Sequence, residues 1–468
     1  MYGTGSMLLA SLESTDGGTR YLIFGAILLP AVIMALIRST WLVDYYFLVV
    51  CTNRLIRRFL DWNDGQYDFR PISSLTPMII ALLMLSVAII NYQTISKENR
   101  KFGAVLIGVL ILGCLLGIRN GLGMIYSFLD YSTPLAILAY ALWLQADLNV
   151  LVRWLRNISV LACGVAAYAW FQWVEMPPWD AFWIEQSGMW TSMGVVQSYR
   201  TAAFGTLESR GPFAWFMATV AIPLILVPRS RSYVNWFGVI LIVSSILPST
   251  VRSAFGIILL AMIGYVLTRG IAKSLYLVFF MALILGAMIA IRQTLPQSEY
   301  MFERLESVTE LSQDSSFQGR VEQAQIGFGT ALSNPFGFGL GSSGLGTMVS
   351  GQSSLVFDNG YLEILSTFGV FGAGVGFIIA FYISKKIYAF ARSYDDDAAY
   401  LLIAFFFSSL GALLFSNWVL MSCSSIGVLC LAVAIVSMEK KHSESFDDDM
   451  GFEESDEYRL DQEGIWAE

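Results

Sequence analysis

The feature that most constrains this chain is a succession of apolar blocks, most of them about 17 to 22 residues long. A helix of that length, rising 1.5 Å per residue, crosses roughly 30 Å of hydrocarbon. Inside a bilayer such a segment must satisfy its own backbone hydrogen bonds, which requires a helix. The blocks predict spans at 21–38, 77–95, 102–118, 124–144, 155–174, 212–228, 234–249, 252–268, 275–291, 361–384, 398–416 and 418–438.

We therefore predict an all-α, polytopic transmembrane bundle of twelve or thirteen spans. The uncertain segment is 41–51, which is short for a span and could instead lie in the membrane interface. Composition agrees, since 56% of the residues are hydrophobic and only 14% are charged, too few for a soluble domain. An outer-membrane barrel would show short alternating segments instead.

The two ends of the chain are polar. The N-terminal polar segment is 1–20, and residues 1–19 lack a basic region before the first apolar block, so no cleavable signal peptide is expected. Residues 439–468 are acidic and predict a disordered tail. No cofactor, metal ion or nucleic-acid partner is expected.

Basic residues in short loops predict the orientation, because such residues concentrate on the cytoplasmic side. We predict that the protein lies in the inner (cytoplasmic) membrane with its C-terminus in the cytoplasm. One set of basic residues then falls on the cytoplasmic side: Lys97, Arg100, Lys101, Arg153, Arg156, Arg229, Arg231, Arg269, Lys273, Lys385, Lys386, Lys440 and Lys441. Arg54, Arg57 and Arg58 fit poorly, since twelve spans place them outside. Their segment could be an amphipathic helix lying in the interface.

This topology divides the chain at two long extracytoplasmic loops, 175–211 and 292–357, of which the second is expected to carry short helices. Helical membrane segments are predicted at 21–174, 212–291 and 358–438. Loops of this length on a rigid scaffold commonly carry the functional site.

Four arginines fall on the outside against the charge preference, namely Arg200, Arg210, Arg252 and Arg320. A guanidinium presents a planar fork that binds phosphate oxygens in pairs, so together these arginines could bind a diphosphate. Salt bridges to Glu175, Glu208 or Glu322 are the alternative.

Three stretches carry a family resemblance: YRTAAFGTLESRGPFAWFMA (199–218), STVRSAFGIILLAMIGYVL (249–267), and the region from GRVEQAQIGFGTALSNPFGFGLG (319–341) to DNGYLEILSTFGVFGAGVG (358–376). Over residues 195–440 the chain resembles the O-antigen ligase and Wzy-type polysaccharide polymerase superfamily, whose members are integral membrane glycosyltransferases of the GT-C class. The resemblance implies an undecaprenyl-diphosphate-linked oligosaccharide as donor. It also implies that Arg200, Arg210, Arg252 and Arg320 contact the diphosphate, without a metal ion.

Ligases of that family place a histidine where this chain has Asp358, directly before Asn359. The only histidine, His442, lies past the last span. Asp358 is therefore the candidate general base, supported by Asn359, Tyr361 and Glu363. Alternatively, Asp358 caps the helix that begins after the loop.

Two further patterns have ordinary explanations. The turn 333–346 is rich in glycine but lacks the Gly-Lys-Ser/Thr of a phosphate-binding loop, so we interpret it as a flexible loop beside the site. Residues Asp395, Asp396 and Asp397 are interpreted as a solvated charge run.

The sequence thus predicts a glycosyltransferase that polymerises lipid-linked repeat units into exopolysaccharide, capsule or O-antigen on the outer face of the membrane. Its expected partners are membrane lipid and polysaccharide chain-length or export proteins. The missing histidine favours a polymerase over a ligase that transfers the glycan to lipid A-core. A lipid-linked oligosaccharide flippase is the rival from another class. It predicts charged or broken helices near the middle of the bilayer.

Overall fold

The computed structural model describes residues 17–68, 72–231, 233–294, 299, 302, 315–344, 346–347, 357, 359–414, 425–442 and 444. Helices joined by turns make up this part of the chain, and it contains no β-strand, which confirms the predicted all-α fold. The helices are α2 (Gly17–Leu36), α3 (Trp41–Asp64), α4 (Thr76–Ile90), α5 (Lys97–Leu116), α6 (Leu122–Trp143), α7 (Leu148–Glu175), α8 (Pro178–Ser187), α9 (Trp190–Met193), α10 (Arg210–Leu226), α11 (Asn235–Ser244), α12 (Arg252–Arg269), α13 (Tyr276–Thr294), α15 (Ser315–Ser333), α17 (Gly360–Tyr394) and α18 (Asp397–Ala412). Residues 425–442 form a further helix.

Six helices are long and apolar enough to cross a membrane, namely α2, α5, α6, α7, α12 and α17. Several shorter helices are also apolar, including α4, α10 and α18. Only 11% of the apolar window of α2 and 17% of that of α5 is buried inside the protein. Apolar helices that leave so much of their surface uncovered are suited to a lipid environment. The chain is a helical membrane protein by this criterion, and the count of twelve or thirteen spans stays a prediction.

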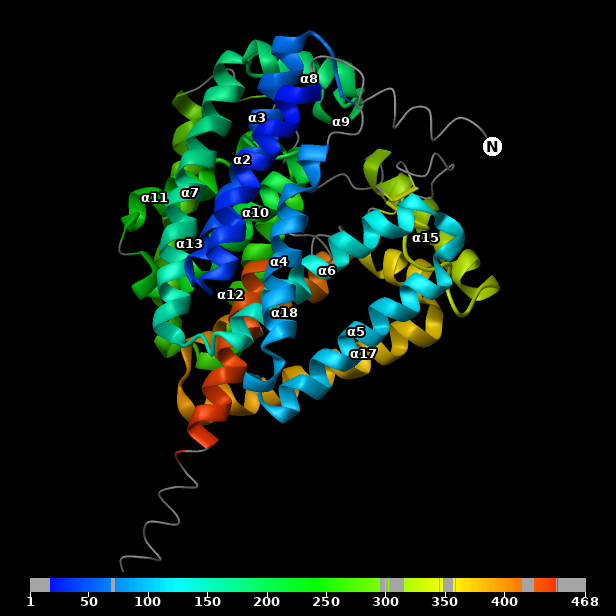
Figure 1. Ribbon diagram of the computed structural model, residues 1–468. Helices are drawn as coiled ribbons and strands as arrows, with labels where there is room; N and C mark the ends of the chain where they lie inside the picture. The colour runs from blue at the N-terminus through cyan, green and yellow to red at the C-terminus, as the bar shows by residue number, and fades with distance from the viewer. Residues whose placement is uncertain are drawn as a thin grey trace, which may run out of the picture.

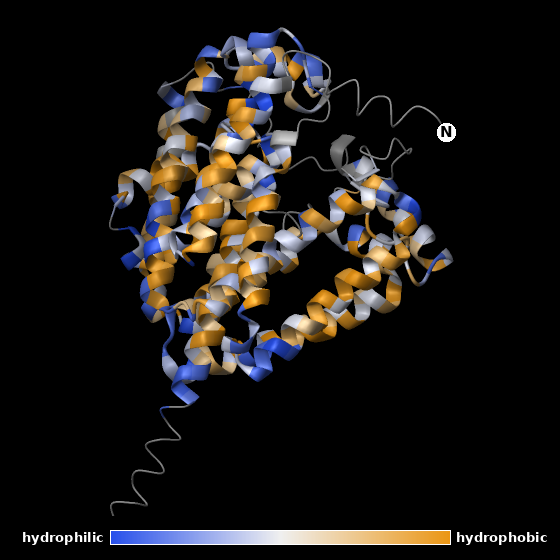
Figure 2. Ribbon diagram, viewed as in Figure 1, coloured by the Kyte–Doolittle hydropathy of each residue, from blue (hydrophilic) through white to orange (hydrophobic). Residues whose placement is uncertain are grey.

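The helices form a main bundle and a smaller group that leans away from it (Figure 1). At the centre of the main bundle lies α10, whose residues from Phe216 to Leu226 are all buried. It packs against α12, which packs in turn against α18. In the smaller group α5 and α17 run side by side, and α15 packs on α17. Figure 2 shows hydrophobic residues along most of the helix lengths and hydrophilic residues toward the ends of the bundle.

Polar contacts define two ends of the bundle. At the end that carries α8 in Figure 1, here called the upper end, Arg20 at the start of α2 pairs with Asp64 at the end of α3, with 2.7 Å between N and O. At the opposite, lower end, the Trp154 indole donates to the carbonyl of Thr40, which precedes α3. Also at that end, Arg156 donates to the Arg229 carbonyl. The helices α3 and α7 therefore run in the same direction, opposite to α2.

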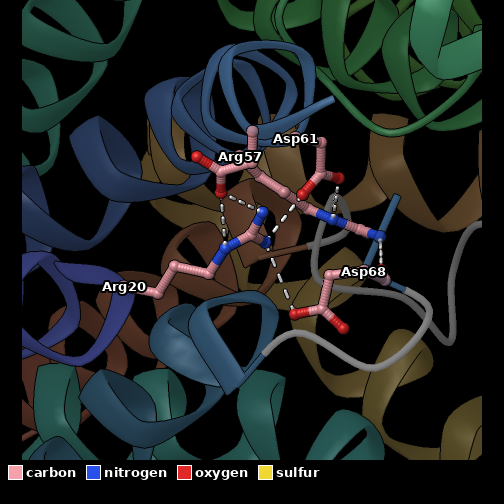
Figure 3. A network of polar contacts seen from close by, with 5 residues as sticks. Arg20, Arg57, Asp61 and Asp68 are labelled. Atoms are coloured by element: carbon pink, nitrogen blue, oxygen red, sulfur yellow. Dashed lines mark hydrogen bonds and ion pairs between the residues drawn. The ribbon is translucent and has the colours of Figure 1, made fainter. Parts of the chain in front are cut away.

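The structure gives the segment 41–64 a definite place. It forms one helix, α3, that packs against α7 and α8. Figure 3 shows Arg20 between Asp61 and Asp68, with Arg57 beside them. The N–O distances are 2.7 Å for Arg20–Asp61 and 3.3 Å for Arg57–Asp61. Arg57 and Arg58 are buried in such pairs, so α3 packs against the rest of the protein along this face. The alternative that it lies in the membrane interface stays a prediction.

Candidate functional site

Two of the four predicted arginines lie close together at the upper end. Arg210 is the first residue of α10, and Arg252 is the first residue of α12, which packs beside α10. The Arg210 guanidinium donates to the hydroxyl of Thr250, 3.1 Å away and two residues before Arg252. Both arginines are partly buried.

An arginine at the first position of a helix opposes the helix dipole, whose positive end lies there. Here two such helix ends lie near each other, because α10 packs against α12 and Arg210 contacts Thr250, two residues before Arg252. Backbone N–H groups at helix N-termini also bind phosphate and carboxylate groups. The arrangement at Arg210 and Arg252 is therefore chemically suited to an anion with several oxygens.

The other two predicted arginines are less informative. Arg200 is exposed on the connection between α9 and α10. Arg320 lies in α15, which packs on α17 in the smaller group of helices, and the placement of its side chain is not described. The structure therefore brings together Arg210 and Arg252 of the predicted set.

The residues at the start of α17 have mainly structural contacts. Asn359 caps the helix, since its side-chain oxygen accepts hydrogen bonds from the backbone N–H groups of Tyr361 and Leu362. The Tyr361 hydroxyl donates to the Leu410 carbonyl of α18, 2.6 Å away. Asp358 itself lies outside the described residues. The alternative that Asp358 caps this helix is wrong, because Asn359 occupies the cap position.

Glu363 is the carboxylate that the structure places in a defined site. It is 7% exposed and accepts a hydrogen bond from the hydroxyl of Tyr131 in α6 at 3.1 Å. A Cβ atom placed on Gly344 would lie 3.6 Å from the same carboxylate oxygen, in ordinary van der Waals contact. Glu363 thus sits where α6, α17 and the glycine-rich segment meet.

Two more carboxylates extend this site toward the arginines. Asp130, next to Tyr131 in α6, lies within electrostatic range of both Glu363 and Glu208. Glu208 pairs with Arg54 of α3 at 2.9 Å and precedes Arg210 by two residues. Glu208, one of the three acids named as alternative partners of the predicted arginines, thus pairs with Arg54, which was not in the predicted set. We call Asp130, Glu208 and Glu363 the carboxylate cluster.

A buried polar network fixes the backbone that leads to Glu208 and Arg210. Arg58 is paired with Asp180 of α8 at 2.9 Å and donates to the carbonyl of Gly205. Gln172 of α7 donates to Asp180 at 2.7 Å and accepts from the N–H groups of Phe204 and Gly205. Burial raises the pKa of the Asp180 carboxyl, while Arg58 and the hydrogen bonds from Gln172 and Tyr168 oppose that rise. We call these residues the Arg58 anchor.

The glycine-rich segment is packed, contrary to the prediction of a flexible loop. Three successive backbone N–H groups donate to backbone carbonyls of neighbouring helices. Phe338 donates to Ser366 and Gly339 donates to Thr367, both in α17, and Leu340 donates to Gly113 in α5. Gly339 has a φ of 76°, and a Cβ atom there would collide with the backbone of Gly117. Only glycine allows two backbones to approach this closely. In the part of the chain described here, this segment joins α5 to α17.

The lower end corrects a further prediction. Asp397 pairs with Arg269 at 3.2 Å, Asp395 pairs with Lys273 at 3.7 Å, and Asp396 caps α18 through the N–H of Ala399. The interpretation as a solvated charge run is therefore wrong for Asp396 and Asp397, whereas Asp395 is exposed. Each has a structural contact at the junction of α12, α17 and α18.

Sequence reasoning missed Asp130, Tyr131 and Arg54. Asp130 had a usable signal, because it is an acid inside an apolar block, and such residues are functional candidates. The role of Arg54 depends on folding, which brings α3 to the segment before α10. No group of three or more His, Cys, Asp or Glu residues suited to a metal ion occurs in the described part of the chain.

Comparison with known proteins adds no relative. No family model matches the chain, and no curated protein matches it.

Proposed function

We propose that this protein is a membrane glycosyltransferase that polymerises undecaprenyl-diphosphate-linked repeat units on the outer face of the cytoplasmic membrane. The observation that carries the proposal is the pair Arg210 and Arg252 at two adjoining helix N-termini, next to a carboxylate cluster. Both arginines belong to the stretches that resemble the polymerase and ligase superfamily.

The proposed topology has thirteen crossings, with the upper end outside and the lower end in the cytoplasm. Its main support is that α2 and α3 run in opposite directions along the bundle, with α3 parallel to α7. The arginines of α3 can be accommodated in a crossing helix because Asp61 and Asp180 neutralise them. Basic residues at the lower end, such as Arg153 and Arg229, then follow the charge preference.

In the proposed reaction Arg210 and Arg252 hold the donor diphosphate and stabilise its charge as it leaves. The acceptor hydroxyl oxygen forms a bond to the anomeric carbon, and the bond from that carbon to the diphosphate oxygen breaks. The hydroxyl proton passes to a carboxylate. Asp358 is the proposed base, and Glu363, held by Tyr131, is the described carboxylate nearest to it along the chain.

The test is polymer formation from lipid-linked repeat units by the purified protein in liposomes, followed as a ladder on a gel. We expect Arg210→Lys and Arg252→Lys to lose at least about tenfold in rate, because a point charge does not replace a forked contact. Arg100→Lys at the lower end is the matched control and should retain full activity. Normal polymer formation by both Lys variants would contradict the proposal, and normal activity of Asp358→Ala would remove Asp358 as the base.

Two alternatives have distinct outcomes in the same system. A ligase would transfer a single glycan to lipid A-core and produce no ladder from repeat units alone. A flippase is favoured by one observation, the presence of Asp130 within the apolar helix α6. It would move the lipid-linked glycan between leaflets without forming a glycosidic bond, which a leaflet-specific lectin assay would detect.

A further inference from the structure

A cleft of about 450 Å³ opens at the lower end of the bundle. It is lined by the cations Arg229, Arg269 and Lys273, the carboxylate Asp397, and four further residues from the same helix ends, namely Leu226, Pro228, Tyr265 and Tyr276. The cleft lies at the opposite end of the bundle from Arg210 and Arg252, because α10 and α12 begin at the upper end. It is therefore separate from the site of the proposed transferase.

The walls of the cleft are held in place by their own contacts. The Arg269 guanidinium pairs with Asp397 and lies 5.2 Å from the centre of the Tyr400 ring. The Tyr276 hydroxyl donates to the Leu226 carbonyl at 2.8 Å, and the Tyr265 hydroxyl donates to the same carbonyl. Arg269 and the two tyrosines therefore need little rearrangement to receive a ligand, which favours binding.

The charges around the cleft leave an excess of positive charge. Arg269, Lys273 and Arg229 contribute three cations, whereas Asp395 and Asp397 contribute two carboxylates. Lys273 is 61% exposed at the side chain, and Arg229 is exposed as well. These two cations are therefore accessible at the mouth of the cleft.

Apolar side chains continue from the basic mouth. Ile271, Leu275 and Phe279 are 74%, 62% and 68% exposed and flank Lys273 along the chain. A free phosphate would use only the cations. A ligand that carries a phosphate and hydrocarbon chains would use both surfaces, and a basic pocket between membrane helices is suited to an anionic lipid headgroup.

We propose that this cleft binds the phosphodiester headgroup of an anionic glycerophospholipid from the cytoplasmic leaflet. Arg229 and Lys273 contact the phosphate, Arg269 forms the rigid back wall, and the acyl chains lie along Ile271 and Leu275. This inference rests on the proposed orientation, with the lower end in the cytoplasm, and not on the protein's catalysing glycosyl transfer.

The test is lipid retention by the full chain, measured by native mass spectrometry after incubation with phosphatidylglycerol or phosphatidylcholine. The variant Arg229→Gln/Lys273→Gln should lose about thirtyfold in affinity for phosphatidylglycerol, from two charges near the membrane surface. The control Lys385→Gln/Lys386→Gln removes the same charge from exposed lysines at the C-terminal half of α17 and should retain the lipid.

Equal losses in the variant and the control would overturn the proposal, because the effect would then reflect general surface charge. Displacement of the lipid by millimolar inorganic phosphate would also overturn it, since the cleft would then recognise phosphate alone. Both changed residues are exposed, so folding should be preserved. If the double variant is not monodisperse, the single variant Lys273→Gln provides the same comparison with Lys385→Gln.

Discussion

Two groups of acids in this protein, one buried and one partly buried, differ in their surroundings. Asp180 faces a cation and two neutral donors, namely Arg58, Gln172 and Tyr168. Asp130 instead faces two other carboxylates, Glu208 and Glu363, and the nearby Arg54 is already paired with Glu208. The first group is balanced in charge, whereas the second concentrates negative charge.

This difference in charge balance distinguishes the Arg58 anchor, which is structural, from the carboxylate cluster, which is the candidate site. Burying a charge is unfavourable unless partners compensate for it, and the Arg58 anchor supplies them. Like charges gathered in a partly buried site destabilise the fold and hold at least one group ready to accept a proton. The comparison therefore predicts that mutations in the anchor affect stability, and that mutations in the carboxylate cluster affect the reaction.

The largest effect is expected for Arg58→Ala. Removal of the guanidinium leaves the Asp180 carboxylate buried without its cation, which should lower the free energy of unfolding by about 3–5 kcal/mol. Thermal unfolding of the purified protein in detergent measures the loss. The control is Arg100→Ala, which changes an exposed residue. It should change the free energy of unfolding little.

The double variant Arg58→Met/Asp180→Leu sharpens this prediction. It removes both charges together, so it should recover much of the stability that Arg58→Ala loses. If Arg58→Ala unfolds at the same temperature as the unchanged protein, the Arg58 anchor does not hold the segment before Arg210 as we describe.

The second prediction concerns the carboxylate cluster. Glu363→Gln keeps the hydrogen bond from Tyr131 but removes a negative charge, so stability should be unchanged or slightly higher. The rate of polymer formation should fall about tenfold, less than on loss of the proposed base Asp358, because Glu363 supports that base and does not itself take the proton. Asp130→Asn should preserve stability in the same way, with a smaller loss of rate.

Glu185→Gln is the matched control for these variants, because Glu185 is an exposed acid on α8. It should change neither the rate nor the unfolding temperature. A large loss of stability in Glu363→Gln would contradict the distinction between the Arg58 anchor and the carboxylate cluster, because Glu363 would then be a structural group like Asp180.

Much of the fold could be predicted because membrane helices follow from local sequence. The apolar blocks gave α5, α6, α7 and α12 nearly in place, since length and hydropathy alone specify them. The segment 41–64 could not be placed, because Arg58 becomes compatible with a packed helix only when Asp180 arrives from α8. Partners that distant in sequence leave no local pattern.

The candidate site was predicted only in part for the same reason. Arg210 and Arg252 were selected because the predicted topology places them outside, where arginines are rare. Their proximity depends on α10 packing against α12. The glycine-rich segment was misinterpreted because the same glycines that permit flexibility also permit the backbone contacts between Gly339 and Gly117.

The smallest predicted effect concerns the cap that holds Glu363 in place. Asn359→Ala removes the acceptor for two N–H groups of α17 and should lower stability by about 1 kcal/mol. Because Glu363 lies in the first turn, fraying there should also reduce polymer formation. Asp147→Ala removes the comparable cap of α7 at the lower end and should lower stability without changing the rate. Equal rates of polymer formation in Asn359→Ala and Asp147→Ala would show that the position of Glu363 does not depend on its helix cap. The distinction between the Arg58 anchor and the carboxylate cluster would then rest on charge alone.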